Sequence, residues 1–498
     1  MKNIFISVVL FSLLCSCAVS HPFNTAHKYS PQELQADYDL FRNILEAEHP
    51  GLYWYTSKDS IDYYFERGKR QLQDSLTETD FRNILSYVTA KIRCGHTTVQ
   101  ASKAFARQIG HQRPRLFPLS IKIWDDTAVV TANLNRRDTN IIRGVVLTSI
   151  DNKPLQEVRD SLFQFLSADG YNLTHKYQTL SNRGVFNNLY RNVYGFKPMY
   201  QVGFIDTLGQ SRTARLSLFV PPKDTSKSTV QQAPHKPSRR EQKHLTLKAI
   251  RSVRTDTVLQ AAVIDLNSFT KDSKLRGFFK QTFRQLKQNG IQHVIIDLRG
   301  NGGGSVINSN LLTKYIASQP FKIADSLYAL RRNSPYGRYQ QYRIWNWLFL
   351  VLMTRRKEDK HYHFRFFEGK YFKPKKKNHY QGQVYVLTGG NTFSASTLFV
   401  QAVKEQDNVT IIGEETGGGA YGNNAWLIPD VTLPHTKIRF RLPLFRLVVD
   451  KNAPKGRGIF PEVEASPTVE AIRRNTDYKL EKAIELIRKD NGRNVYRK

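Results

Sequence analysis

Two continuous apolar segments, each followed by a glycine-rich turn and a helical pattern, constrain the fold of this chain most strongly. The first segment, 293–298, runs into Asp297 to Ser305, which contains four glycines. The second, 384–387, runs into Gly389 and Gly390. Uninterrupted apolar strands are typical of a parallel sheet that is covered on both faces. Together with the amphipathic helical pattern at 275–286, they predict an α/β domain.

The turn after the second segment presents a serine. Thr392 to Thr397 reads Thr-Phe-Ser-Ala-Ser-Thr and leads into a helical pattern from Leu398 to Val403. A strand–turn–helix geometry exposes a serine hydroxyl beside the free amides of a helix N-terminus, which suit the oxyanion of acyl transfer. The alternative is that Ser394 or Ser396 only caps the helix, because serine is a favoured N-cap residue.

The chain is long enough for two or three domains, and its charge is strongly positive. It has 498 residues, a hydrophobic content of 40% and a formal net charge of +33. Such a charge invites a nucleic-acid interpretation, but no recognised nucleic-acid motif accompanies it. We therefore expect no nucleic-acid partner and interpret the charge as favouring an anionic envelope surface or acidic substrates.

The N-terminus predicts export and a lipid anchor. Residues 1–17 combine Lys2, an apolar run and the segment Leu14-Cys15-Ser16-Cys17, which looks like a bacterial lipobox with Cys17 as the lipidated residue. An ordinary signal peptidase site at 18–20 is the alternative. The only other cysteine is Cys94, so we expect no structural disulfide. No Cys/His metal spacing is present, and the glycine-rich loop lacks a phosphate-binding pattern, so no metal or cofactor is predicted.

The remaining patterns divide the mature chain into four parts. Residues 30–105 predict a small helical unit that delivers His96 directly after Gly95. Residues 115–220 predict a module of short strands with one helix, which is either a peptide-capturing unit or a spacer. Residues 221–245 read as a linker or disordered loop. Residues 246–480 form the α/β domain.

Residues 321–382 are predicted to be an insertion that interrupts the α/β domain. Its short apolar segment 344–353 contains Trp345 and Trp347 and is flanked on both sides by arginines. The segment predicts a helix that is a lid over the site, an interfacial helix touching lipid, or a buried element.

Four motifs in a fixed order resemble the S41 peptidases, the family of tail-specific (C-terminal processing) proteases and the tricorn core. They are Asp-Leu-Arg-Gly-Asn-Gly-Gly-Gly at 297–304, Ser-Ala-Ser at 394–396, Gly-Glu-Glu-Thr-Gly-Gly at 413–418 and Gly-Ile-Phe-Pro-Glu at 458–462. The resemblance implies a multidomain α/β fold, with an N-terminal helical unit, a PDZ-like β-rich module and a catalytic domain with a mostly parallel sheet.

The resemblance also implies which residues act. Tail-specific members pair the serine with a lysine, but that position is Gly419 here, so a Ser-Lys dyad is not expected. Tricorn-like members use a histidine from the N-terminal unit, and Gly95-His96-Thr97 looks like that segment. Ser394 would attack the peptide carbonyl, and His96 would act as the base.

The other roles follow the same resemblance. The amides of Ala395 and of one glycine of the Gly302-Gly303 pair would stabilise the oxyanion. The family's glutamate aligns near Lys455, so Asp450 is the predicted acidic partner and Glu462 the second choice. Cys94 stands where relatives usually have aspartate.

We therefore predict a serine endopeptidase that hydrolyses exported proteins or peptides and is lipid-anchored in a bacterial cell envelope, facing the periplasm or the exterior. The expected partners are protein or peptide substrates and a membrane. The alternative is a catalytically inactive, S41-like peptide-binding protein, since the lysine is missing and the acid is uncertain.

Overall fold

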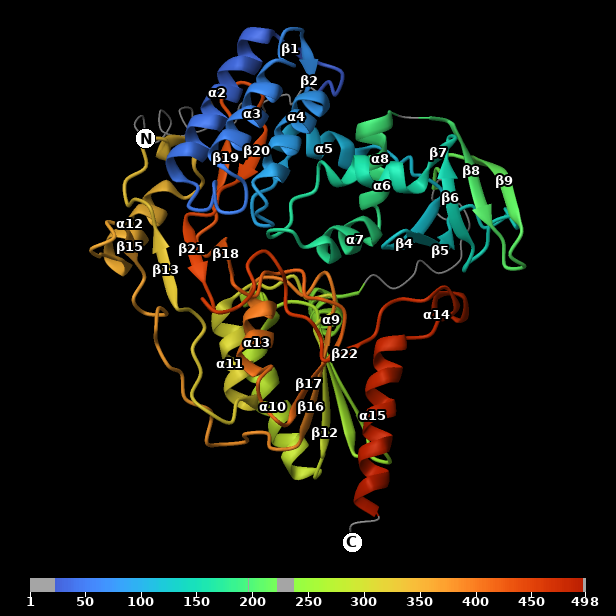
Figure 1. Ribbon diagram of the computed structural model, residues 1–498, viewed down its shortest axis with the longest axis vertical. Helices are drawn as coiled ribbons and strands as arrows, with labels where there is room; N and C mark the ends of the chain where they lie inside the picture. Colours follow the sequence, from blue (N-terminus) through green and yellow to red (C-terminus); the bar gives the residue numbers. More distant parts are fainter. Residues whose placement is uncertain (1–22, 196, 222–236, 496–498) are drawn as a thin grey trace, which may run out of the picture.

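The computed structural model describes residues 23–195, 197–221 and 237–495. The N-terminal helices, the β-rich module and the α/β domain form three distinct regions of the molecule (Figure 1). The predicted signal segment and Cys17 lie outside the described residues. Within the described ranges, no helix has both the length and the apolar character needed to cross a membrane.

The N-terminal region is a helical unit, as predicted. Its main helices are α2 (Pro31–Glu48), α3 (Lys58–Lys69) and α4 (Glu78–Lys91), followed by the short strand β3 (Val99–Gln100) and α5 (Lys103–His111). The strands β1 (Lys28–Tyr29) and β2 (Leu76–Thr77) pair beside them. Helix α2 begins with a capping box, in which Ser30 and Glu33 satisfy each other's backbone amides.

This helical unit packs into the C-terminal half of the chain. The Phe41 ring meets the Phe440 ring edge-on at 5.0 Å. The buried carboxylate of Asp37 accepts hydrogen bonds from the amides of His435 and Thr436 and from the Thr436 hydroxyl. Because β3 also pairs with β20 (Arg439–Arg441), the segment that carries His96 is attached to the α/β half.

The β-rich module is an antiparallel sheet in the order β4-β5-β6-β8-β9, with β7 added to β6. Its strands are β4 (Leu119–Trp124), β5 (Thr127–Asn133), β6 (Val146–Ile150), β7 (Lys153–Pro154), β8 (Met199–Ile205) and β9 (Ser211–Ser217). Besides the predicted helix α6 (Leu155–Phe163), it has α7 (Leu173–Ser181) and α8 (Val185–Tyr194). Its likeness to a PDZ domain stays a prediction.

The α/β domain is built on a six-stranded sheet in the order β10-β11-β12-β16-β17-β22. Only β10 is antiparallel to its neighbour, so the prediction of a mostly parallel sheet is confirmed. The strands are β10 (Arg251–Asp256), β11 (Ala261–Leu266), β12 (His293–Asp297), β16 (Gln383–Thr388), β17 (Val409–Gly413) and β22 (Val463–Glu464).

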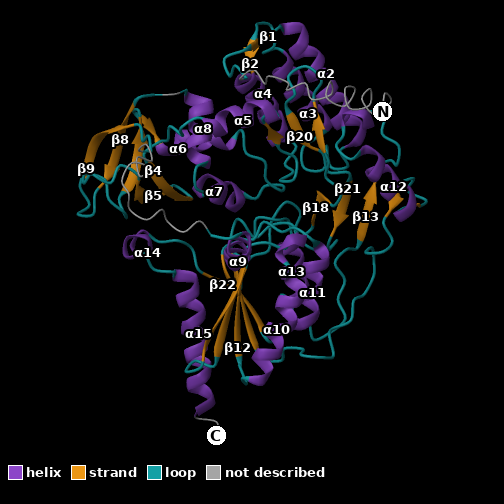
Figure 2. Cartoon of the chain, turned by 180° about the vertical axis from the view of Figure 1, so that it is seen from behind, coloured by secondary structure: helices purple, strands orange, loops and turns teal. Residues whose placement is uncertain are grey.

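Helices cover both faces of this sheet. Figure 2 shows α15 on one face and α10, α11 and α13 on the other. Their bounds are α10 (Leu275–Gln288), α11 (Val306–Ile316), α13 (Ala395–Val403) and α15 (Tyr478–Val495), with the short α14 (Val469–Arg474) before the last. The central strands β12, β16 and β17 are largely buried for this reason, which explains their continuous apolar sequence.

The predicted insertion contributes to a second sheet. Its strands follow the order β14-β15-β13-β21-β18, where β13 (Ser326–Ala329), β14 (Arg355–Arg356) and β15 (Tyr362–His363) come from the insertion. Strands β18 (Gly422–Ala425) and β21 (Phe445–Val448) come from the chain after α13, and β19 (Asp430–Thr432) pairs with β20 nearby.

The tryptophan-containing segment of the insertion forms helix α12 (Arg343–Met353). Only Asn346 and Leu350 on this helix are buried, whereas Ile344 is 72% and Trp345 is 70% exposed. The alternative of a simply buried helix is therefore wrong, because most of the apolar surface of α12 is open to solvent.

The C-terminal end of the segment predicted to be a linker or disordered loop, 221–245, is helical. Residues from 239 onward form helix α9 (Arg239–Ile250), which opens with a capping box between Ser238 and Glu241. The helix buries no side chain, which is why its sequence has the polar composition of a linker. Residues 222–236 lie outside the described residues.

Candidate active site

Ser394 occupies the junction between β16 and α13. Its backbone has φ 56° and ψ −122°, a strained conformation for a residue with a side chain, and such strain clusters at functional sites. Ser394 stands at the N-cap position of α13, yet in this part of the described chain its side chain makes no capping hydrogen bond. The alternative that Ser394 only caps the helix is therefore wrong, and its hydroxyl is free for other partners.

The strained turn is held by the neighbouring strand-end loop. The buried hydroxyl of Thr392 donates to the Leu298 carbonyl at 2.9 Å, and the Phe393 amide donates to the Asn301 carbonyl at 3.1 Å. Because β12 and β16 are adjacent and parallel, their following loops meet at the same edge of the sheet. The loops that follow the apolar segments 293–298 and 384–387 therefore form one structure.

Gly303 makes the closest approach to Ser394. A Cβ added to Gly303 would lie 2.7 Å from the Ser394 Cβ and 2.9 Å from the Ala395 amide nitrogen, and its φ is +94°. The Gly303 amide itself donates to the Asn301 side-chain oxygen at 2.9 Å. Of the predicted glycine pair, Gly302 is exposed, and its amide is the better candidate for the oxyanion because the Gly303 amide is already bonded to Asn301. Ala395 is the first residue of helix α13.

His96 packs against the residue that precedes the serine. Its imidazole ring lies 4.7 Å from the Phe393 ring, measured between centroids, with an interplanar angle of 36°. His175 stacks near the same ring at 4.7 Å and 20°. Gly95 is required here, because a Cβ at this position would lie 2.6 Å from the Phe393 ring. The fold therefore brings the predicted histidine and the predicted serine onto touching segments.

The environment of His96 keeps the imidazole neutral. The residue is buried, and burial, followed by the charges of Arg441 and His175, lowers its pKa to about 3. Among the described residues, neither ring nitrogen has a hydrogen-bond partner, so no hydrogen bond joins His96 to Ser394 in this structure. A neutral imidazole is the form that accepts a proton, and catalytic hydrogen bonds often tighten only with substrate.

Asp169, which sequence reasoning missed, lies beside His96. Its carboxylate accepts hydrogen bonds from the Gly95 amide at 2.8 Å and from the Gly419 amide at 3.4 Å. Burial raises its pKa to about 7 despite those two bonds. Ligand atoms of Cys94, His96 and Asp169 all lie within 4.8 Å of one another. Asp169 follows α6 in the β-rich module, so no motif around His96 indicated it.

The two acidic residues predicted for the site bond elsewhere. Asp450 accepts from the Gln401 side chain at 3.1 Å and from the Asn452 amide at 2.9 Å. Glu462 accepts from the Ile411 amide beside β17. Neither is hydrogen-bonded to His96, whose nitrogens have no partner among the described residues. The structure thus brings Ser394, Ala395 and Gly303 together and packs His96 against Phe393, but it does not join Asp450 to them.

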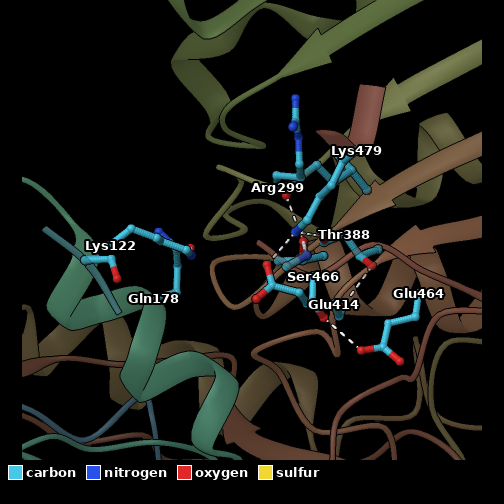
Figure 3. A network of polar contacts seen from close by, with 12 residues as sticks. Lys122, Gln178, Arg299, Thr388, Glu414, Glu464, Ser466 and Lys479 are labelled. Atoms are coloured by element: carbon cyan, nitrogen blue, oxygen red, sulfur yellow. Dashed lines mark hydrogen bonds and ion pairs between the residues drawn. The ribbon is translucent and has the colours of Figure 1, made fainter. Parts of the chain in front are cut away.

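A buried ion pair supports the same edge of the sheet. Lys479 of α15 donates to the Thr388 carbonyl at 2.7 Å and to Glu414 at 2.6 Å, and Figure 3 shows it pointing into this cluster. Burial raises the pKa of Glu414 and Lys479 lowers it, with a net fall. The pair fixes α15 to the ends of β16 and β17, directly upstream of the serine turn.

A serine at a strand–turn–helix junction is the arrangement in which α/β-hydrolases present their nucleophile. Residues 260–463 match the model of Peptidase family S41. The chain therefore carries an S41 peptidase domain, and the resemblance predicted from its motifs is confirmed.

Solved structures share the fold over most of the chain. Mature CPAF is 14% identical, with a TM-score of 0.62 over 92% of this chain and 96% of that one. Mature CPAF complexed with lactacystin gives 14% identity and a TM-score of 0.63, covering 92% of this chain and 98% of that one. No curated protein matches the chain. At this identity the CPAF structures show the fold alone, and they confirm the predicted multidomain α/β architecture.

Proposed function

We propose that this protein is a serine endopeptidase with Ser394 as nucleophile and His96 as general base. The observation that carries the proposal is the strained Ser394 backbone, held with its hydroxyl uncapped while the adjacent Phe393 packs on His96. The S41 domain supports peptide-bond hydrolysis as the reaction.

In the proposed reaction, the Ser394 hydroxyl attacks the substrate carbonyl and passes its proton to His96. His96 then gives that proton to the leaving amine, and water hydrolyses the acyl-enzyme in the same way. The amides of Ala395 and Gly302 would stabilise the oxyanion, since one starts a helix and the other lies on the exposed side of the neighbouring loop.

For the acidic role we propose Asp169 in place of Asp450. Its carboxylate is buried within 4.8 Å of a His96 nitrogen, and it also fixes the Gly95 amide, which positions the histidine backbone. Asp169 is thus a positioning residue, which acts through His96. Imidazolium formation beside it would favour its ionised form.

The substrate and location are also proposals. The export segment and Cys17 favour a lipid-anchored envelope enzyme that acts on exported proteins or peptides. The antiparallel sheet of the β-rich module ends in β4 and β9 as its edge strands. Helix α7 covers β4, where the Ile123 amide donates to the Ser181 hydroxyl, whereas β9 is largely exposed, and an open edge of this kind suits capture of an extended peptide.

Labelling with a fluorophosphonate probe tests the nucleophile. We expect wild type to be labelled and Ser394→Ala to be unlabelled. Ser396→Ala is the matched control, because Ser396 is two residues away and its hydroxyl is buried; it should stay labelled. Absence of labelling in a folded wild-type protein would favour the inactive peptide-binding alternative, and labelling retained in Ser394→Ala would identify a different nucleophile.

A further inference from the structure

Cys94, His96 and Asp169 form a compact cluster of three metal-ligand types. One ligand atom from each residue lies within 4.8 Å of the other two, and all three residues are buried. Cys94 and His96 flank Gly95, and Asp169 is held against that same glycine by its amide. A thiol, an imidazole and a carboxylate are the ligands that zinc prefers.

The histidine is the second, independent sign of a ligand. Both His96 ring nitrogens are buried and lack a hydrogen-bond partner among the described residues, although buried polar groups are almost always paired. Asp169 uses its two oxygens for backbone amides but retains further lone pairs, and the Cys94 thiol donates a long hydrogen bond, 3.9 Å, to the Asn424 carbonyl.

We propose that Cys94, His96 and Asp169 bind a single Zn²⁺ ion and that this binding reversibly inhibits the peptidase. Three protein ligands leave one position for water. Tetrahedral zinc needs metal–ligand distances of about 2.0–2.3 Å, so the three side chains close around the ion by small rotations.

Inhibition by zinc follows from what the metal does to Cys94 and His96. Zn²⁺ binding releases the Cys94 thiol proton to solvent and forms a zinc–thiolate bond, with no change in oxidation state. A His96 nitrogen donates its lone pair to the metal. If zinc binds the His96 nitrogen that would accept the Ser394 proton, that nitrogen can no longer act as the base. If zinc binds the other ring nitrogen, the metal holds the imidazole ring away from Ser394. The inhibition, but not the binding, rests on the proposed function.

Binding is measured first, on the purified full chain, by competition for Zn²⁺ with a chromophoric chelator. We expect one zinc per chain at micromolar affinity or tighter, with a loss of about tenfold or more in Cys94→Ser and in Asp169→Asn. Ser394→Ala is the matched control, because it lies outside the ligand set and should bind zinc like wild type. Co²⁺ should give thiolate charge-transfer absorption that Cys94→Ser abolishes.

Inhibition is then measured as the zinc concentration that halves each variant's own metal-free rate. Wild type should be inhibited at the concentration at which it binds, and Cys94→Ser should need at least about ten times more. Wild type that binds no zinc, or Cys94→Ser that binds as tightly, would overturn the metal site. Zinc bound without any peptidase activity would instead overturn the proposed function and leave the metal site standing.

Helix α12 supports a second inference, which is independent of the active site. Its exposed apolar residues are Ile344, Trp345, Trp347, Leu352 and Met353. Exposed basic residues stand at both ends of the helix: Arg343 is its first residue, and Arg355, Arg356 and Lys357 follow its last turn. Ile344, Trp345 and Leu352 lie on one side of the helix, and an apolar side with arginine at the ends is the composition of a helix that lies in a membrane interface.

We infer that α12 docks on an anionic phospholipid bilayer. The basic ends complement negatively charged headgroups, while the apolar side enters the acyl boundary. Trp345 and Trp347 report this directly, because both indoles are exposed.

Quenching by brominated lipids tests the docking on the full chain. We expect vesicles of phosphatidylglycerol to quench tryptophan fluorescence strongly and vesicles of phosphatidylcholine weakly. The double variant Trp345→Phe/Trp347→Phe should lose most of that quenching. Unquenched wild type on phosphatidylglycerol, or quenching unchanged in the double variant, would refute the inference, and self-association of wild type abolished by Ile344→Glu would assign the face to a second copy instead.

Discussion

The buried carboxyl group of Asp169 makes a quantitative prediction about stability and pH. Burial raises its pKa from 3.8 to about 7 in the folded protein. Each unit is 1.36 kcal/mol, so ionising this group costs the folded state about 4 kcal/mol relative to the unfolded chain. Replacing it with asparagine, Asp169→Asn, removes the titration and keeps an oxygen that accepts from the Gly95 amide.

The sign follows from proton binding. Between pH 3.8 and about 7 the folded state holds the Asp169 proton and the unfolded chain does not. The stability that this group contributes is therefore fully present below the unfolded-state pKa of 3.8 and is lost as the pH rises through the folded-state pKa of about 7. Relative to Asp169→Asn, wild type should lose about 4 kcal/mol of unfolding free energy between pH 4 and pH 8.

Urea unfolding of both proteins at several pH values, in chelator so that no metal holds the carboxylate ionised, gives this difference directly. Subtracting the variant cancels the titrating groups that do not interact with Asp169. A wild-type-minus-variant difference that changes by less than about 1 kcal/mol across the range would refute the argument from burial.

Three further predictions concern the serine turn, the Lys479–Glu414 ion pair and the contact between the helical unit and the C-terminal half. Gly303→Ala should lower kcat by about 10²-fold or more in a folded protein, because the new Cβ would displace the nucleophile's turn; steady-state rates and circular dichroism check this. Lys479→Met should cost about 3–5 kcal/mol in urea unfolding by leaving Glu414 buried and unpaired, and adding Glu414→Gln should recover most of that loss. Asp37→Ala should destabilise the protein by about 3 kcal/mol in urea unfolding, because three hydrogen-bond donors lose their acceptor. The control Asp39→Ala breaks an exposed ion pair with Lys69 and should cost less than about 1 kcal/mol in the same assay.

Local sequence was sufficient to predict the elements that carry strong periodicity or caps. Helix α2 begins and ends where the Ser30 capping box and Pro50 indicate, and the parallel strands coincide with the continuous apolar runs. The serine turn was predictable because strand, glycine pair, serine and helix follow each other within one short segment.

Non-local relations were not predictable from the same patterns. Asp169 reaches His96 only because the β-rich module folds back onto the helical unit, and its surrounding sequence carries no catalytic signature. The exposed face of α12 was undecided, since an apolar helix reads the same whether it is buried or open. Helix α9 was not predictable, because none of its residues is buried and its polar sequence shows no apolar periodicity.

Cleavage of an unstructured acidic peptide and a hydrophobic-tailed peptide by the purified protein, beside Ser394→Ala and His96→Ala, tests the central claim most directly. We predict cleavage by wild type, and its loss in both variants with the fold intact. Cleavage that survives His96→Ala but not Ser394→Ala would show that another group is the base. Cleavage retained in Ser394→Ala, or none by folded wild type, would contradict the assignment of Ser394 as the nucleophile of an active peptidase.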